Sequence, residues 1–411
     1  MPPVFRHLAR QPIRRCAPCS PLPFRLLASC MLALLLSLPA AAQLGYFHVE
    51  NRNGVWWMID PQDQTTMLAG VDRMLYRGPA ASSYFQSVKA RYPDESAWDF
   101  EALARLKLWR FNMIGPESDP TLWNYRVPYV MDLHIAEHSG ADWQKDRPLD
   151  VFDPAFAKNA QEVADEGCLP RTTDHWLVGY LSDDDMPWSE ARSRHASMLA
   201  MYLRLPAESP GRQHAIEFLR LRYRDNTRAW ALAWGTKRVK TFDRIEAAPA
   251  SPTAAYRADA AAFLAEVAAR YFQICASAIH RADPNHLYLG ASISLPAPEA
   301  VLMAARIADA VALDLSVPDP RKEVTRAYRL AGKPVWIAAF DLPVPSSSRA
   351  AAYASFVRQL AALPAAVGYS WRAWTGNDGL VDDSDQPYAG FVAAVAQSNR
   401  NAAAWHAEAR P

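Results

Sequence analysis

The sequence predicts a (β/α)8 barrel, because short β-prone runs alternate with helical stretches eight times along the chain. No internal repeat or low-complexity segment interrupts this alternation. Half of the residues are apolar, enough to fill the core of one barrel, a fold that often reaches this length as a single domain. The expected strands occupy residues 66–71, 111–115, 129–134, 176–181, 286–291, 310–315, 334–339 and 367–372.

Residues 1–42 have the features of a secretory signal peptide. An arginine-rich start precedes a 13-residue apolar run at 26–38 and the small residues Ala40, Ala41 and Ala42. The apolar run is shorter than the roughly 20 residues that a membrane-spanning helix needs, and we expect no later segment to be long enough. We therefore expect a secreted or periplasmic protein without membrane association once the signal peptide is removed.

Residues 43–65 are expected to form a β-hairpin. Two β-rich runs flank Asn53 and Gly54, a dipeptide typical of two-residue hairpin turns. We interpret this hairpin as a cap at the barrel entrance, with Trp56 and Trp57 attaching it to the barrel base.

The barrel proper is expected over residues 66–405, with a helical lobe inserted at 186–285. Phe263, Val267, Tyr271 and Ile274 recur at helical spacing and predict a helix that packs one face against the barrel. The stretch at 186–285 is too long for one connection, so we expect several helices that form a lobe over one side of the barrel mouth.

Charges and cysteines restrict the partners. The chain has 44 basic and 43 acidic residues, so no charge surplus would attract nucleic acid or anionic lipid. Two cysteines follow the signal peptide, Cys168 and Cys275, for which a disulfide and two buried free thiols are both open. A neutral or small partner is favoured.

The chemistry of such a barrel resides at the carboxyl ends of its strands, because every following loop opens on the same face. The fourth expected strand ends in three carboxylates, Asp183, Asp184 and Asp185, and the seventh ends in Ala339 and, two residues later, Asp341. These strand ends are therefore the first candidates for a functional site.

The chain contains eight motifs in order: VWWMIDP, GVDRMLY, FNMIG, VFDPAF, VGYLSDDDMPW, EFLRLRY, DPNHLYLG and KPVWIAAF. Together they resemble the secreted agarase-like glycoside hydrolases of the large retaining (β/α)8 clan, over nearly all of the chain after the signal peptide. The resemblance implies a general acid/base glutamate preceded by an asparagine at the fourth strand, and a nucleophilic glutamate at the seventh strand.

The sequence departs from that pattern at the positions that carry catalysis. The resemblance places Asp184 at the asparagine, Asp185 at the acid/base glutamate and Ala339 at the nucleophile, and Asp314 also stands where the family tends to have asparagine. Retaining hydrolysis needs two carboxyl groups about 5–5.5 Å apart, and a methyl group cannot attack a sugar. Loss of one member of a catalytic pair typically reduces the rate by roughly four to six decades, so impaired catalysis is implied.

Asp341 offers a substitute for the missing nucleophile. It lies two residues beyond Ala339 and therefore points to the same side of the strand, one step farther out. A carboxylate there could activate water for an inverting reaction with Asp185 as the acid, where separations of roughly 6.5–9.5 Å are used. The alternative is an ordinary solvated aspartate in the following loop.

The segment from His134 to His138 spells H-x-x-E-H, the inverted zinc-protease pattern. Its two histidines converge on a metal only when they share a helix, whereas this segment follows a β-rich run. We therefore expect no metal ion and no cofactor. His134 is interpreted either as polar lining of a sugar site or as ordinary loop packing.

Aromatic and polar residues after other strands are further candidates. Trp371 and Trp374 stand at the end of the eighth strand and Trp188 follows the aspartates. Their indole faces could stack on sugar rings or pack in the core. The resemblance implies substrate contacts for Arg73 and Tyr76 after the first strand, and the alternative for Arg73 is an ion pair that closes the barrel.

We expect a secreted, agarase-like barrel that binds an oligo- or polysaccharide and has lost retaining hydrolysis. Two alternatives stay open: an active glycosidase with Asp185 as acid and Asp341 as base, and a structural envelope protein whose mouth is filled by side chains. An open mouth lined by tryptophans favours binding, whereas a mouth filled by the 186–285 lobe favours a structural role.

Overall fold

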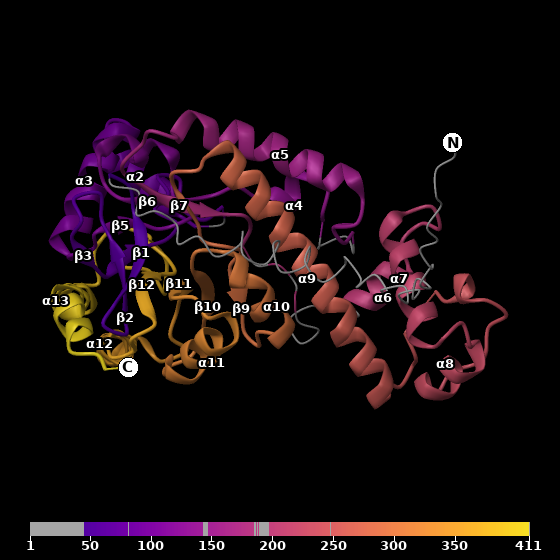
Figure 1. Cartoon of the computed structure of the whole chain (residues 1–411). Helices are drawn as coiled ribbons and strands as arrows, with labels where there is room; N and C mark the ends of the chain where they lie inside the picture. Colours follow the sequence, from indigo (N-terminus) through magenta and orange to yellow (C-terminus); the bar gives the residue numbers. More distant parts are fainter. Residues whose placement is uncertain are drawn as a thin grey trace, which may run out of the picture. The chain divides into compact units, whose positions relative to one another are not determined.

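The computed structural model describes residues 45–410 except 81, 143–146, 185, 187, 189–196 and 247 (Figure 1). Nine strands of this described part form a parallel sheet in the order β8-β7-β6-β5-β4-β12-β11-β10-β9. They are β4 (Leu68–Val71), β5 (Met113–Ile114), β6 (Tyr129–Asp132), β7 (Leu177–Leu181), β8 (Leu287–Tyr288), β9 (Ile293–Ser294), β10 (Val311–Leu315), β11 (Val335–Phe340) and β12 (Ala366–Trp371).

The two terminal strands of this sheet are pieces of one barrel strand. β8 pairs with β7 and β9 pairs with β10, and only residues 289–292 separate β8 from β9. Gly290 in this gap has a positive φ of 82°, which interrupts the extended backbone. The gap still bonds to the end of β7, since Ser182 N donates to Gly290 O at 2.9 Å and Ser292 N to Asp183 O at 2.9 Å. The predicted α/β barrel with eight strand positions is therefore confirmed.

Helices cover the outside of the barrel. Asp94 and Asp153 begin two of them by accepting a hydrogen bond from a backbone N–H of the first turn. The barrel helices are α2 (Tyr84–Arg91), α3 (Glu95–Leu108), α4 (Ile135–His138), α5 (Pro154–Cys168), α10 (Glu299–Ala304), α11 (Arg321–Ala331), α12 (Arg349–Ala361) and α13 (Ala389–Ala407), with 3-10 turns η1 (Pro120–Tyr125), η3 (Leu169–Arg171), η5 (Ala305–Ile307) and η6 (Ser346–Ser348).

The predicted helical insertion follows β7. It contains α6 (Met198–Leu203), α7 (Pro210–Arg222), α8 (Thr227–Trp234), η4 (Phe242–Arg244) and the 29-residue α9 (Ala254–Ala282). One part of α9 packs against α5 and α10 of the barrel, and another against α6 and α8 of the lobe. Inside the lobe, buried Asp259 of α9 accepts hydrogen bonds from Tyr223 Oη at 2.6 Å and Trp234 Nε1 at 2.7 Å.

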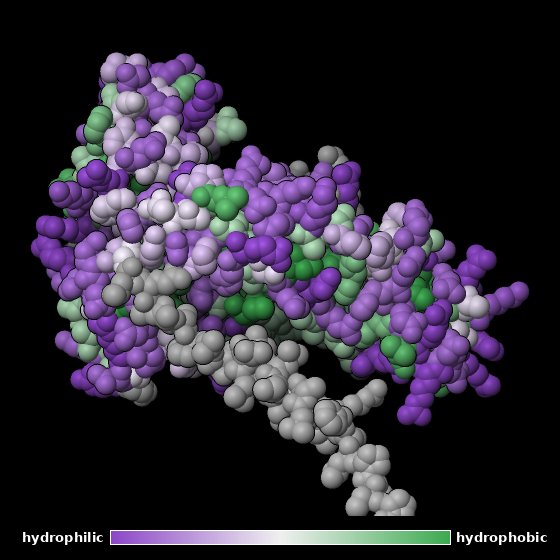
Figure 2. All heavy atoms as spheres, turned by 45° about the horizontal axis from the view of Figure 1, so that its top comes forward, coloured by the Kyte–Doolittle hydropathy of each residue, from purple (hydrophilic) through white to green (hydrophobic). Residues whose placement is uncertain are grey.

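Helix α9 is, by length and composition alone, able to cross a membrane, which the sequence analysis did not anticipate. However, 56% of its most apolar window is buried within the protein, which is typical of a core helix. The molecular face in Figure 2 is mostly hydrophilic, with apolar residues in small separate patches. Exposed apolar side chains of this scattered kind are normal on globular proteins.

The N-terminal hairpin lies at the end of the barrel where the strands begin. Strands β1 (His48–Arg52), β2 (Val55–Ile59) and β3 (Thr65–Thr66) form a separate antiparallel sheet. Phe47 and Met58 pack into the cluster of apolar side chains that fills the barrel, and Trp56 N donates to Pro364 O, just before β12, at 2.7 Å. Trp57 lies edge-on to the ring of His406 at the end of α13. The expected attachment to the base is thus observed, but the interpretation of the hairpin as a cap at the entrance is wrong.

The two cysteines of the described chain are free, buried thiols, which decides between the two states left open by the sequence. Cys168 ends α5 and Cys275 lies within α9. Burial raises the pKa of Cys168 to about 12, so its thiol stays protonated at neutral pH. Both residues therefore act as small apolar packing groups.

Candidate functional site at the barrel mouth

The carboxyl ends of the strands gather a set of ionisable side chains, which we call the mouth residues. Because the strands are parallel, the residues at their carboxyl ends lie at the same end of the barrel. Carboxylates outnumber cations among them, so each needs a proton or a partner to be buried. The mouth residues are Asp72 after β4, Glu117 after β5, Asp132 and His134 at the end of β6, Asp183 and Asp184 after β7, Asp314 in β10, Asp341 after β11 and Arg372 after β12.

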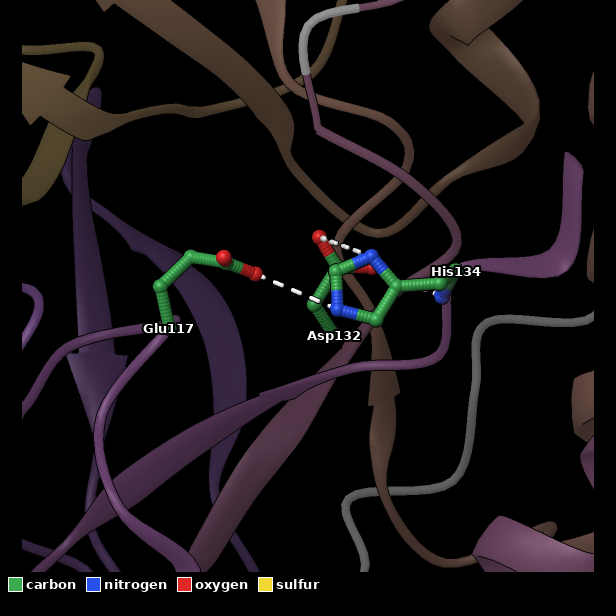
Figure 3. A group of neighbouring side chains, drawn as sticks. All are labelled: Glu117, Asp132 and His134. Carbon is green, nitrogen blue, oxygen red and sulfur yellow. Dashed lines mark hydrogen bonds and ion pairs between the residues drawn. The ribbon is translucent and has the colours of Figure 1, made fainter. Parts of the chain in front are cut away.

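His134 lies between two carboxylates (Figure 3). Its Nε2 is 3.2 Å from Oε1 of Glu117, and its Nδ1 is 3.9 Å from Oδ2 of Asp132. The hydrogen bond to Glu117 raises the pKa of His134 to about 9 and lowers the pKa of Glu117. The imidazole is therefore a cation at neutral pH, and its side chain is 40% exposed. This placement agrees with polar lining, one of the two alternatives left open by the sequence.

Asp132 is the buried member of this group, with a side chain only 2% exposed. Its Oδ1 accepts a hydrogen bond from the backbone N–H of His134 at 3.0 Å, whereas its Oδ2 has no hydrogen-bond partner. Burial raises the pKa of Asp132 well above its usual range, against the attraction of the His134 cation. One oxygen of this carboxyl group is thus held by the backbone, and the other faces the imidazole without a hydrogen bond.

Asp183 is buried beneath the mouth and does not face it. Its Oδ1 accepts from the backbone N–H of Ala136 at 2.8 Å, and its Oδ2 contacts the hydroxyl of Tyr271. Burial raises the pKa of Asp183 to about 7. The Tyr271 hydroxyl donates to Oδ2, which opposes the effect of burial on the pKa of Asp183, and it also lies 2.9 Å from Ser182 Oγ. The expectation that Asp183 binds substrate is therefore wrong, because only 4% of this residue is exposed.

Asp72 is a second buried acid, 3% exposed, directly after β4. Burial and the nearby charge of Asp184 raise the pKa of Asp72 well above its usual range, while Arg73 and Arg372 oppose the rise. A Cβ atom added at Gly115 would lie 2.0 Å from Asp72 Oδ1. Only glycine at that position leaves room for this carboxyl group.

Arg372 joins two strand ends by contacting two carboxylates. Its Nη2 donates a hydrogen bond to Oδ1 of Asp314, and its Nε lies 2.7 Å from Oδ2 of Asp341. Ser294 Oγ donates to the other oxygen of Asp314 at 3.2 Å. Burial opposes the charge of Arg372, yet the two aspartates raise its pKa above the usual value. Asp341 is therefore an ion-paired group, 30% exposed, and not a solvated loop residue.

The positions that the resemblance assigns to catalysis are only partly described. Ala339 lies in β11, in register with Asp314 of β10, and is 8% exposed. Asp185 lies outside the described residues, so its distance from Asp341 stays undetermined and its catalytic role stays a prediction. At the position expected for a nucleophile, β11 presents a methyl group.

The three tryptophans proposed for sugar stacking are buried. Trp371 is 1% exposed and packs edge-on against Phe340, and Trp374 is 0% exposed and lies 5.3 Å from the ring of Trp109. Trp188, 5% exposed, packs against the aromatic side chains of α9. Of the two alternatives left open by the sequence, the structure therefore supports core packing for all three indoles.

Three other predicted contacts have accessible surface. Arg73 is exposed, adopts a left-handed backbone conformation with φ 54°, and donates its backbone N–H to Pro116 O at 3.2 Å. Tyr76 is half-buried and packs edge-on against Phe85. Asp184 is half-buried and acts electrostatically on Asp72. Their role in binding a substrate stays a prediction.

The sequence analysis missed Glu117, Asp132 and Arg372 as members of the site. Glu117 follows the predicted strand FNMIG by two residues, and Asp132 and Arg372 lie within predicted strand ends. A search for every ionisable residue within two positions of a predicted strand end would have found all three.

Comparisons with known proteins match this architecture, although no protein-family model matches the chain. The chain is 27% identical over 377 residues to beta-agarase A of Vibrio sp. (strain JT0107), covering 79% of this chain and 38% of that protein. A solved exo-beta-agarase has a TM-score of 0.74 at 20% identity, covering 94% of this chain and 71% of that one. A second solved agarase has a TM-score of 0.72 at 19% identity, covering 90% and 67%.

The chain is similar to beta-agarases in sequence and to solved agarases in fold. The predicted resemblance is thus confirmed at the level of sequence relatives and of fold. The chain spans less than half the length of the curated relatives it matches, 38% of beta-agarase A and 39% of beta-agarase B from the same Vibrio strain. Activity and substrate therefore do not follow from this similarity alone.

Replacing Arg372 by methionine should destabilise the agarase-like barrel. The Arg372→Met variant keeps most of the side-chain volume but leaves Asp314, which is 1% exposed, buried without its cation. We expect the free energy of unfolding to fall by about 3–5 kcal/mol, measured by urea denaturation. The variant Arg321→Met breaks an exposed pair with Asp319 and should show no measurable change. The double variant Arg372→Met/Asp314→Asn should regain much of the lost stability. If it is destabilised as much as Arg372→Met alone, an unpaired Asp314 charge is not the cause.

Asp183 should make stability depend on pH. Its pKa of about 7 in the folded chain exceeds the ordinary 3.8, so stability falls as pH rises from about 4 through 7, by up to roughly 4 kcal/mol. Asp183→Asn keeps the acceptor for Ala136 N and cannot ionise. We expect this variant to match the wild type at pH 5 and to be more stable at pH 8, by urea denaturation. Parallel pH profiles would show that Asp183 is not protonated in the folded chain.

Proposed function

We propose that this chain is a carbohydrate-binding barrel that has lost retaining glycoside hydrolysis. The observation that carries the proposal is Ala339, a methyl group at the strand end where the resemblance implies a nucleophilic glutamate. The neighbouring carboxylates Asp314 and Asp341 are poor substitutes for a nucleophile, because Arg372 forms ion pairs with both. A guanidinium bound to a carboxylate stabilises its charge and weakens it as a base or nucleophile.

Carbohydrate binding is supported by the kind of surface that remains at the mouth. His134, Arg73, Tyr76 and Asp184 keep partly exposed polar groups there. Such a set of donors and acceptors suits a ligand rich in hydroxyl groups. The relatives are named as agarases, so we propose an oligo- or polysaccharide of the galactan class as the ligand.

We also propose that the protein is exported. This rests on the arginine-rich start, the apolar run at 26–38 and the small residues at 40–42 of the sequence. A polysaccharide ligand of the galactan class is consistent with a periplasmic or extracellular location.

The proposal predicts no hydrolysis above background. Wild type, Asp185→Asn and Asp341→Asn should release equal amounts of reducing sugar from agarose and from a panel of galactans and glucans. Release by the wild type that falls at least a hundredfold in Asp341→Asn would overturn the proposal in favour of the inverting glycosidase. The double variant Asp185→Glu/Ala339→Glu supplies both carboxyl groups of the resembled pattern, and we expect it to hydrolyse agarose measurably.

The proposal also predicts that Arg73 contributes to binding. Loss of a charge-assisted hydrogen bond removes about 1.5–3 kcal/mol, so Arg73→Ala should bind agaro-oligosaccharides roughly 10- to 100-fold more weakly by calorimetry. Arg126→Ala is a matched control, since Arg126 is also exposed and left-handed with φ 58° but precedes β6 at the opposite end of the barrel. Absence of binding by folded wild-type protein would instead favour the structural alternative.

A further inference from the structure

We infer that Glu117, Asp132 and His134 form a binding site for a divalent transition-metal ion at the barrel mouth. Each residue offers one ligand atom, and these atoms lie within 4.8 Å of one another. The three side chains point toward one another in Figure 3. This inference departs from the expectation of no metal that the sequence alone gave, and it does not depend on the proposed sugar ligand.

The backbone holds two of the three residues in unusual positions. Glu117 has φ 59° and His134 has φ 50°, both in the left-handed region that non-glycine residues seldom adopt. Neighbouring contacts hold the backbone at His134: its N–H donates to Asp132 Oδ1 at 3.0 Å, and Ile135 N donates to Ser182 O at 2.9 Å. Backbone strain of this kind is common at sites that must hold side chains in a fixed geometry.

The second observation is the buried carboxyl group of Asp132. Its side chain is 98% buried and its Oδ2 atom, directed toward the imidazole, has no hydrogen-bond partner. A buried acceptor without a partner destabilises the folded chain, and more strongly when it is charged. A cation placed between Asp132, Glu117 and His134 would satisfy this oxygen directly.

The ligand atoms indicate which metal fits. Imidazole nitrogen together with carboxylate oxygen suits Zn²⁺ and similar transition metals, whereas Mg²⁺ and Ca²⁺ prefer oxygen alone. Bonds of about 2.0–2.2 Å to the metal place ligand atoms roughly 3–3.5 Å apart. The distance of 3.2 Å between His134 Nε2 and Glu117 Oε1 already matches, and a separation of 4.8 Å must shrink by roughly 1.5 Å, within reach of side-chain rotation.

Charge and coordination also agree with a dication. Two carboxylates and a neutral imidazole balance the charge of Zn²⁺, which would take the place of the proton that His134 otherwise carries. Three protein ligands leave the fourth position open for water or an exogenous oxygen ligand. The site therefore has the form of an open metal centre at the mouth.

The inferred site differs from the H-x-x-E-H pattern. His138 lies in α4, is exposed, and its Nδ1 is 2.8 Å from the backbone oxygen of His134. The group that converges on one point uses His134 with carboxylates from the ends of β5 and β6. A test can therefore separate the two arrangements by residue.

Zinc binding by the full chain, stripped of metal and desalted, tests the inference without any sugar. Competition with a chromogenic chelator and elemental analysis should give one Zn²⁺ per chain. Asp132→Asn and Glu117→Gln both keep the shape of the side chain. Each should weaken Zn²⁺ binding by about 10- to 100-fold. Co²⁺ bound in place of Zn²⁺ should show a visible absorption band that His134→Gln changes.

Two histidine variants serve as controls. His214→Gln removes an exposed histidine that pairs with Glu266 at 2.7 Å and is outside the group of three inferred ligands. His138→Gln removes the second histidine of the H-x-x-E-H motif. Both should bind zinc as the wild type does. The inference is overturned if the wild type binds no stoichiometric zinc, if folded Glu117→Gln binds as tightly as the wild type, or if His138→Gln is the variant that loses the metal.

Discussion

Neutralisation of carboxylates at the mouth is the constraint on which the barrel depends, and Arg372 is its clearest case. Parallel strands deliver Asp314 and Asp341 to the same face, and one guanidinium contacts both. The His134 cation does the same for Glu117, while burial raises the pKa of Asp132 well above its usual range and that of Asp183 to about 7. Each buried carboxylate needs a cation or a proton, because an isolated charge in a medium of low dielectric would strongly destabilise the folded chain.

The eight strand positions and the helical insertion were predictable because each segment has its own pattern of apolar residues, which depends only on neighbouring positions in the sequence. The side of the barrel that the hairpin covers was not, since Asn53-Gly54 reveals a turn but no long-range contact. Only the packing of Phe47 and Met58 into the barrel interior decides it. The break between β8 and β9 was also missed, because a glycine in a β-prone run does not by itself show a left-handed backbone at Gly290.

For the site, the sequence identifies residue types but not their burial or partners. It placed Asp183 and Asp341 at strand ends correctly, yet the Tyr271 contact and the Arg372 ion pair come from elements far apart in the chain. The same holds for Trp371 and Trp374, whose neighbours in the core depend on helix packing. Lost catalysis was inferred from one residue, Ala339. Its register partner Asp314 and the nearby Asp341 are both ion-paired with Arg372.

Helix α9 joins the lobe to the barrel as one unbroken element of 29 residues, about 44 Å long (Figure 1). Barrel helices pack against one part of it and lobe helices against another. Asp259 of α9 accepts hydrogen bonds from Tyr223 and Trp234 of the lobe. A flexible linker would allow the lobe to move independently of the barrel, whereas one continuous helix couples the position of the lobe to that of the barrel helices. Displacement of the lobe would therefore also require movement of α9 and of the barrel helices α5 and α10 that pack against it.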